Sequence, residues 1–347
     1  MSVFTRCIYE SILLLFLRSS PRLTIVMDRK VLRTDSRRGL QVNLYVMMLS
    51  GIIWTPISMA MGVYWQIYLT KLGATPFDIA LIAMASTLTL TISRIVGGYL
   101  ADTIGRRKLI VSMTYMVSLC YFFLSLATTW VMVLFICVLL NIFLMYQPAT
   151  EAIIADSTSE HARGRNYGVL YLAPNIFIMF SPLIALAFIS NYGVVEGTRI
   201  LILSTSVAGF IVGVLRTFKL NETFNGMERK EDHDSMLRRY RHVLEMLAGR
   251  MPSLILLILM LGAIGGLMMM TQLYIITCLG VDYGMWALMQ FLYLLIFAAT
   301  IVPMGIATDH YGRKKMIIIS IVLSLLSTMF LVLASGDGMY GLLIAYI

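Results

Sequence analysis

Two segments of the chain combine glycine, aspartate and basic residues in the same order. Residues 98–108 read GYLADTIGRRK, and residues 305–315, 207 positions further along, read GIATDHYGRKK. Three adjacent cations suit contact with anionic lipid headgroups, but they do not explain the aspartate. Each aspartate falls at the predicted C-terminal end of a helix, where the macrodipole disfavours negative charge unless the N-terminus of another helix faces it. The positions concerned are Gly98, Asp102, Gly105, Arg106 and Arg107, and Gly305, Asp309, Gly312, Arg313 and Lys314.

Further charged residues lie in or beside long apolar stretches. A charge inside a membrane costs about 2.5–3.5 kcal/mol on insertion scales, so such residues are functional candidates. Arg94 lies six residues, about 9 Å, before the predicted end of its helix. Its side chain can therefore extend to the membrane surface, or it can have a functional role in gating or in binding a substrate. Glu151 can pair with a basic group at a gate or carry a proton, and both interpretations stay open. The charged functional candidates are Arg94, Glu151, Asp156, Arg163 and Arg165.

The sequence contains no signature of covalent or metal chemistry. Histidine–glutamate zinc motifs, serine-nucleophile elbows and phosphate-binding loops do not occur. The four cysteines are scattered without the spacing of a metal site or a disulfide framework. We therefore expect no enzyme activity, no cofactor and no metal.

The composition indicates a membrane protein. Of the 347 residues, 59% are hydrophobic and 13% are charged, with a mean hydropathy of +0.85, whereas soluble domains carry about 25% charged residues. This argues against a soluble enzyme and a nucleic-acid binder, despite the net charge of +9. Continuous apolar runs favour helices over a β-barrel. The sequence predicts an all-α polytopic membrane protein with nine helices, at 43–69, 77–100, 109–127, 130–153, 168–190, 199–218, 252–279, 285–306 and 316–334, and the start of a tenth near Met339.

The basic residues gather on one side of these predicted helices. Counting Lys and Arg loop by loop assigns 24 to one side, eight of them in residues 216–251, and two to the other. By the positive-inside rule, the N-terminus and the central linker are expected in the cytoplasm. The predicted organisation is a basic N-terminal segment 1–42, a six-helix bundle 43–218, a charged linker 219–251 and a second bundle 252–347.

With its two repeated motifs, the chain resembles the major facilitator superfamily, in which such a motif follows the second helix. Ser93-Arg94 before the first copy, and residues 148–156 and 163–168, are also similar to that family. The resemblance covers about residues 43–347 and implies two parallel repeats of six helices. Because the sequence predicts nine to ten helices of the usual twelve, we expect a chain shortened at its C-terminus.

The resemblance also implies a function, which is secondary active transport of a small solute by alternating access. It implies a monomer in the lipid bilayer of the plasma membrane, without a nucleic-acid partner, and proton-coupled efflux as one form of transport. The motif aspartates would join the two halves on the cytoplasmic side in the outward-facing state, with Asp309 near residues 163–168. The five charged functional candidates named above would belong to a gate or to coupling. Two other interpretations stay open: a remnant without transport, and a sensor or scaffold on the same fold.

In that family, the first, fourth, seventh and tenth helices line a central cavity. Polar and aromatic residues on these helices are the substrate candidates, although Asn and Gln in membranes also join helices to each other. The chain departs from the family's drug and proton antiporters, because Leu144 replaces an arginine and residues 181–185 replace a Gly-Pro-x-x-Gly pattern. The substrate candidates are Trp54, Asn141, Tyr146, Gln147, Gln272 and Tyr274.

Overall fold

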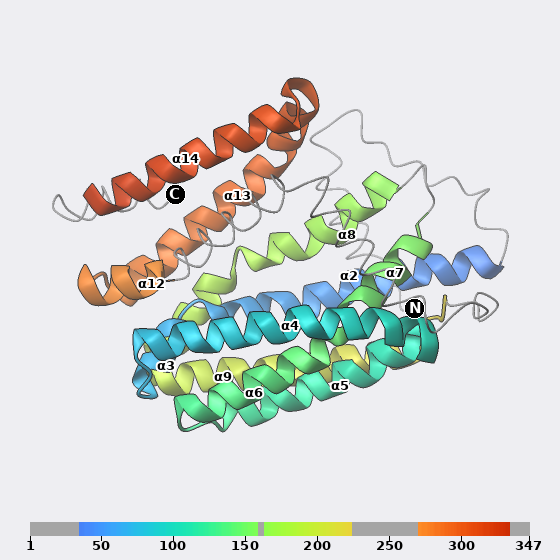
Figure 1. Cartoon of the computed structure of the whole chain (residues 1–347), viewed down its shortest axis with the longest axis horizontal. Helices are drawn as coiled ribbons and strands as arrows, with labels where there is room; N and C mark the ends of the chain where they lie inside the picture. Colours follow the sequence, from blue (N-terminus) through green and yellow to red (C-terminus); the bar gives the residue numbers. More distant parts are fainter. Residues whose placement is uncertain (1–34, 159–162, 224–269, 334–347) are drawn as a thin grey trace, which may run out of the picture.

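The computed structural model describes residues 35–158, 163–223 and 270–333, and its elements in these ranges are helices (Figure 1). Six stretches of the described chain are long and apolar enough to cross a membrane, which confirms the predicted all-α polytopic class. Most of the predicted helix 252–279, most of the linker 219–251 and the predicted tenth helix lie outside the described residues. The six stretches are Gln41–Gly62, Pro76–Ile104, Arg106–Ser125, Trp130–Asp156, Leu170–Lys219 and Tyr283–Thr300.

The first pass is made of two helices rather than one. α2 (Asp35–Gly62) and α3 (Trp65–Lys71) are separated by Val63 and Tyr64, which are not helical. The continuous helix predicted at 43–69 is therefore wrong in this detail.

α4 (Pro76–Ile104) begins with strong local signals. The Thr75 hydroxyl accepts a hydrogen bond from the Asp78 N–H (3.3 Å), and the Asp78 carboxylate accepts one from the Thr75 N–H (2.8 Å), which together form a capping box. The helix ends at Gly105, whose φ of 102° is strained for any residue with a Cβ. α4 thus continues four residues beyond the predicted end at residue 100.

The third and fourth passes follow as an antiparallel pair. α5 (Arg106–Ser125) is the third pass. The fourth consists of α6 (Trp130–Phe143), the short 3₁₀ helix η2 (Leu144–Tyr146) and α7 (Gln147–Asp156). Pro148 lies in the first turn of α7, where its missing N–H needs no partner, so the α-helix restarts there after a 3₁₀ joint.

The fifth and sixth passes form a helical hairpin. α8 (Arg163–Ile178) leads into α9 (Ser181–Lys219), inside which Gly193 has φ 78° and ψ 169° and reverses the chain. The two arms approach closely, because a Cβ on Gly197 would lie 2.9 Å from the Phe188 carbonyl oxygen. The fifth pass is also interrupted between α8 and α9, within the predicted helix 168–190.

The second half is described from the end of its first pass onward. It contains α12 (Thr271–Leu273), the π-helical turn η5 (Tyr274–Cys278), α13 (Tyr283–Tyr311) and α14 (Arg313–Leu333). α4 and α13 both start near α3 and run away from it for 29 residues, so the two motif copies lie at the same end of the molecule. We call this end the motif end and the opposite one the α3 end.

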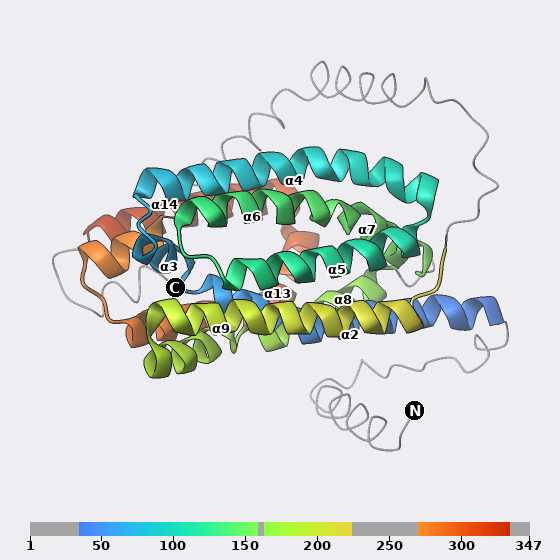
Figure 2. The ribbon, with the colours of Figure 1, turned by 90° about the horizontal axis from the view of Figure 1, so that it is seen from below.

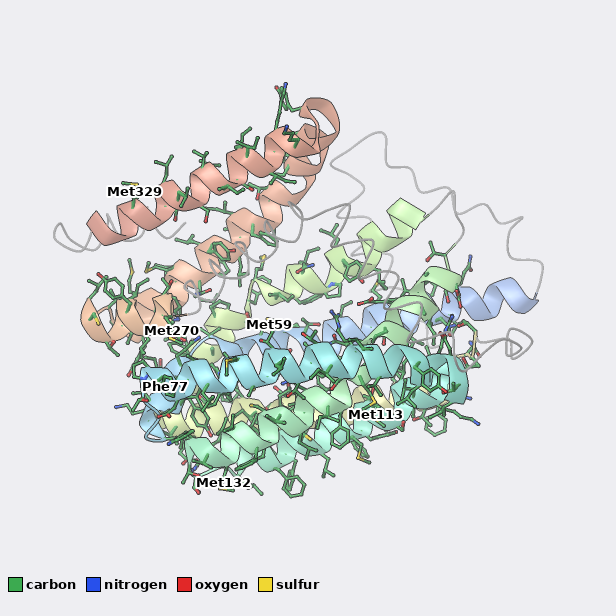
Figure 3. All side chains as sticks on the ribbon, in the orientation of Figure 1. Met59, Phe77, Met113, Met132, Met270 and Met329 are labelled. Atoms are coloured by element: carbon green, nitrogen blue, oxygen red, sulfur yellow. The ribbon has the colours of Figure 1, made fainter. Side chains whose placement is uncertain are left out.

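The helices of the first half pack side by side, with α9 along α2 and α6 between α4 and α5 (Figure 2). α13 contacts both α8 and α9, and α14 lies beyond it (Figure 1). Large apolar side chains project outward from the helices, as a surface solvated by lipid requires (Figure 3). Among those labelled there, Met59, Phe77, Met132 and Met329 are exposed.

Candidate functional site

The first motif copy forms the turn from α4 to α5 and carries an electrostatic conflict. The first turn of α5 holds Arg106, Arg107 and Lys108 and no acidic residue, although the positive end of the helix macrodipole lies there. Gly105 at the N-cap has no side chain with which to accept a bond from the free N–H groups.

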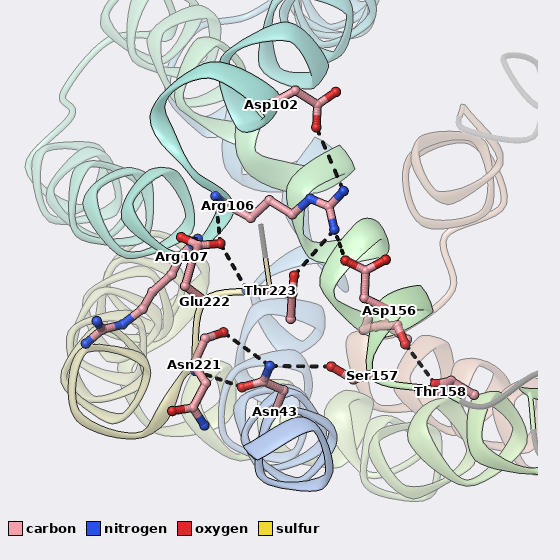
Figure 4. A network of polar contacts seen from close by, with 11 residues as sticks. Asn43, Asp102, Arg106, Arg107, Asp156, Ser157, Thr158, Asn221, Glu222 and Thr223 are labelled. Carbon is pink, nitrogen blue, oxygen red and sulfur yellow. Dashed lines mark hydrogen bonds and ion pairs between the residues drawn. The ribbon is translucent and has the colours of Figure 1, made fainter. Parts of the chain in front are cut away.

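Glu222, just beyond the end of α9, resolves this conflict. Its carboxylate accepts hydrogen bonds from the backbone N–H groups of Arg106 (3.2 Å) and Arg107 (3.0 Å) (Figure 4). A Cβ at Gly105 would lie 3.0 Å from the same carboxylate. Residue 222 therefore caps α5 from a distant part of the chain, a role that the sequence analysis missed because it placed this residue in the linker.

Replacing Glu222 should weaken the packing of the motif turn. We expect Glu222→Ala to lower the free energy of unfolding by about 1 kcal/mol, as the loss of a helix cap does, and Glu222→Gln to lower it less because an amide oxygen still accepts. Titration of the purified chain with SDS in mixed micelles measures this. Equal stability of the alanine variant and the parent chain would contradict the cap.

Arg106 lies at the centre of an ion-pair network. Its guanidinium contacts the Asp156 carboxylate at the end of α7, lies 3.9 Å from Asp102, and donates a hydrogen bond to the Thr223 hydroxyl (3.4 Å) (Figure 4). The Asp102 side chain is 67% exposed, so it remains available to another partner. This network brings together three of the residues singled out in the sequence: Asp102, Arg106 and Asp156.

Asn43 joins three parts of the first half beneath this network. It is fully buried on α2. Its amide donates to the Asn221 carbonyl (3.2 Å) and the Ser157 hydroxyl (3.4 Å), and its Oδ1 accepts from the Asn221 N–H (2.8 Å). Residues 220–223 are thus held against the first bundle, although the sequence analysis assigned them to the linker.

A second charged group lies between α4 and the fourth pass. Arg94 Nε donates to the Gln147 side-chain oxygen (2.9 Å), and its Nη2 pairs with Glu151 (3.3 Å). Because α4 ends at Ile104, Arg94 lies ten residues, about 15 Å, from the helix end, deeper than expected. Gly97, one turn nearer the motif end than Arg94, contacts Met145. The partners of Arg94 follow Met145 in the fourth pass, so the Arg94 side chain must extend toward the motif end to reach its ion pair.

A buried arginine at the motif end escaped the sequence analysis, which counted it among linker cations. Arg216 on α9 donates to the hydroxyls of Ser50 (3.3 Å) and Thr114 (2.7 Å), and its guanidinium lies 5.6 Å from the Tyr146 ring centroid. The described chain gives it no carboxylate partner. Gly209 and Gly213 precede Arg216 at helical spacing and pack against neighbouring helices, so all three residues share the inner face of α9. This spacing of glycines is the sequence signal that could have predicted that Arg216 is buried.

The two halves are joined by hydrogen bonds at the α3 end. Trp286 Nε1 donates to the Val63 carbonyl (2.9 Å), and the Gln272 amide donates to the same carbonyl. The Tyr64 hydroxyl donates to the Tyr283 carbonyl (2.7 Å), and the two rings meet edge to face. Gln272, one of the substrate candidates, contributes to this junction.

The other substrate candidates are placed as follows. The Trp54 ring packs edge to face on Tyr121 (5.8 Å between centroids) and against Gly209, and the Asn141 amide bonds its own helix at the Cys137 carbonyl (2.8 Å). Tyr146 lies under Arg216, and Gln147 is bound to Arg94. Tyr274 begins η5 and is 36% exposed.

The second motif copy is described mainly in its backbone. Gly312 (φ 87°) separates α13 from α14 as Gly105 separates α4 from α5, and Lys314 is exposed. The side chains of Asp309, Arg313, Arg163 and Arg165 lie outside the described part, as does any pairing of Asp309 with residues 163–168. Gly305 is in α13. In the first copy, Gly97 makes a close helix contact and the motif residue Gly98 does not, because a Cβ on Gly98 would meet nothing within 4 Å.

The fold and the repeated motif define a class, a multi-pass helical membrane protein of the two-bundle transporter type. The model of the Major Facilitator Superfamily matches residues 46–347, and the chain belongs to this superfamily. The uncharacterized MFS-type transporter YqjV of Bacillus subtilis (strain 168) is 28% identical over 146 residues, which are 41% of this chain. The chain thus matches about a third (35%) of the length of YqjV.

Two solved structures resemble the chain in fold. One is a bacterial homologue of the human lysosomal transporter Spinster in an inward-facing and unoccupied conformation, with a TM-score of 0.64 and 16% identity over 89% of this chain and 72% of that one. The other is a D-xylose-proton symporter, with a TM-score of 0.61 and 16% identity over 88% and 77% of the respective chains. At these identities, the similarity shows the fold.

Proposed function

We propose that the protein moves a small solute across the membrane by alternating access, with the two halves rocking about a site between them. The observation that carries this proposal is the uneven contact between the halves. Hydrogen bonds and a buried apolar cluster join them at the α3 end, while the α4–α5 and α13–α14 turns lie apart at the motif end (Figure 1). With the motif end in the cytoplasm, as the charge distribution favours, this arrangement corresponds to an inward-open state.

The motif network supplies the second contact that the cycle requires. In the arrangement described, Asp102 is exposed and only weakly paired with Arg106. When the motif end closes, Asp309 would meet the helix N-terminus at residues 163–168, as the repeat symmetry implies. Closing one end while opening the other is the exchange that alternating access needs.

The test uses proteoliposomes and a cross-link across the α3 end. In a cysteine-free variant carrying Tyr64→Cys and Tyr283→Cys, a bismaleimide should hold that end closed. We expect saturable uptake of at least one class in a panel of radiolabelled neutral, anionic and cationic solutes, and its loss on cross-linking. The Tyr64→Cys single variant, treated identically, is the control. Absence of saturable uptake by the parent chain would favour the remnant or the sensor, and full uptake after cross-linking would contradict alternating access.

Proton coupling is the second proposal, and the Arg94–Glu151 ion pair favours it. A proton on Glu151 would cancel the charge that holds Arg94 and release the contact between α4 and α7. A carboxylate that switches an ion pair in this way can link solute movement to a pH gradient. The direction of transport remains an outcome of the vesicle assay.

Replacing Glu151 should separate coupling from transport. With Glu151→Gln, we expect uptake driven by a pH gradient to fall to the rate measured without a gradient, while exchange of labelled for unlabelled solute at equal pH continues. Glu196→Gln, which removes the carboxylate of an ion pair with Arg199 at the other end, is the matched control. Gradient-driven uptake by Glu151→Gln equal to that of the parent chain would rule out this role.

A further inference from the structure

The first pass is interrupted where the two halves meet. α2 ends at Gly62 and α3 begins at Trp65, and Tyr64 between them has φ −123° and ψ 23°. An interruption of this kind frees the last carbonyls of one helix and the first N–H groups of the next. Such groups are costly when they are buried without partners. The break itself is buried, since Ala60, Tyr64, Ile67 and Tyr68 around it are each at most 3% exposed.

The freed groups find partners in the second half. The Gln272 side chain donates to the Val63 carbonyl and accepts from the Gln66 N–H (3.4 Å). One amide therefore occupies the place of the missing helical turn, acting as donor on one side of the break and as acceptor on the other. The Trp286 indole adds a second donor to the same carbonyl (2.9 Å).

The surroundings of these bonds exclude water. Gln272 is 5% exposed and Trp286 is 2% exposed. They adjoin an apolar cluster to which α2 contributes Ala60, α9 contributes Ile189 and Leu201, and α13 contributes Met289. A polar group that loses its partner in such a place has no solvent to replace it.

We propose that the break between α2 and α3 is a gating joint that exists only while the α3 end is closed. This inference rests on the proposed function. When the halves separate there, Gln272 and Trp286 leave, and the Val63 carbonyl recovers the partner that a continuous helix gives it, the Ile67 N–H four residues on. Opening of the α3 end is thus coupled to straightening of the first pass.

Gly62 provides a control position for this coupling. It is the last residue of α2, its φ is not positive, and a Cβ there would meet nothing within 4 Å. Alanine fits without collision, and because residue 62 is helical in both the broken and the straight form, Gly62→Ala should leave the balance between them nearly unchanged.

The experiment needs no solute and uses the full chain in lipid nanodiscs. A cysteine-free variant with Met289→Cys places a reporter in the buried seam, where the native side chain is 1% exposed. The rate of its modification by a maleimide measures how often the α3 end opens. We expect Trp286→Phe to raise this rate about fivefold, as loss of one hydrogen bond predicts. Trp130→Phe, a substitution of the same kind inside the first half, should leave it unchanged.

Hydrogen exchange over residues 62–68 distinguishes a joint from a simple contact. If the helix straightens as the seam opens, deuterium uptake in this segment stays level or falls while the reporter reacts faster. An unchanged reporter rate in Trp286→Phe, or deuterium uptake that rises together with the reporter rate, would overturn the proposal. Both readouts are independent of solute uptake by the parent chain, so failure of the joint and failure of transport are separately visible.

Discussion

A methyl group added at position 97 is expected to disrupt the packing of the first bundle severely. A Cβ on Gly97 would lie 1.7 Å from the Met145 carbonyl oxygen and 2.6 Å from its carbonyl carbon. These are backbone atoms at the η2 joint, so no rotamer change relieves the collision. Because overpacking of a core costs about 1–3 kcal/mol and more where the backbone must move, we expect Gly97→Ala to lower the unfolding temperature and the yield of monodisperse protein.

Gly98→Ala is the matched control for this prediction. It adds the same methyl group one residue further along the same helix, in a place where nothing lies within 4 Å. Both variants gain helix propensity equally, so a difference between them reports the contact alone. Thermal unfolding in detergent compares them, and equal midpoints would mean that α4 and η2 are not packed as described.

Removal of the Arg106 side chain is the second change with a large expected effect. Arg106→Ala deletes the contacts with Asp102, Asp156 and Thr223 and leaves two carboxylates near each other without their cation. The Arg106 side chain is only 17% exposed, whereas the carboxylates are more accessible to water. The cost therefore falls below that of breaking a fully buried pair, and we expect about 1–3 kcal/mol of lost unfolding free energy.

Lys108→Ala tests whether this loss is specific. It removes a cation from the same helical turn, but Lys108 is exposed, so a change within about 0.5 kcal/mol is expected. SDS titration measures both variants. The double variant Arg106→Ala with Asp156→Ala should lose less than the sum of the two single losses, and strict additivity would show that the pair contributes nothing.

The repeated motif shows most clearly which features could be predicted from the sequence and which could not. The repeated glycines and basic triplets predicted two equivalent helix-to-helix turns, and Gly105 and Gly312 both have the positive φ that such a turn needs. The same pattern did not reveal which glycine permits close packing, because Gly97 and Gly98 are equivalent until the rotation of α4 is known. It also did not reveal Glu222 as the cap of α5, since that contact joins residues more than a hundred positions apart.

For the charged and polar residues in the apolar stretches, too, the sequence predicted some features and left others to the tertiary structure. Their depth predicted that Arg94 and Glu151 are functional candidates, and the structure pairs them. Gln272 was predicted as a substrate candidate, and the sequence did not reveal that the break in the first pass gives it backbone partners. Arg216 was counted with the linker because it lies close to a helix end, where composition does not reveal which way a side chain turns.

The sequence by itself determined the membrane class, the family and the common end of the two motif copies. These follow from the length of apolar runs, the charge of the loops and a repeated local pattern, all of which are properties of contiguous residues. The tertiary structure decided which glycine touches a neighbouring backbone, which arginine is buried, which carboxylate caps α5 and where the first pass breaks. Those outcomes depend on the rotation and approach of helices, and on backbone groups that find partners only when distant segments meet.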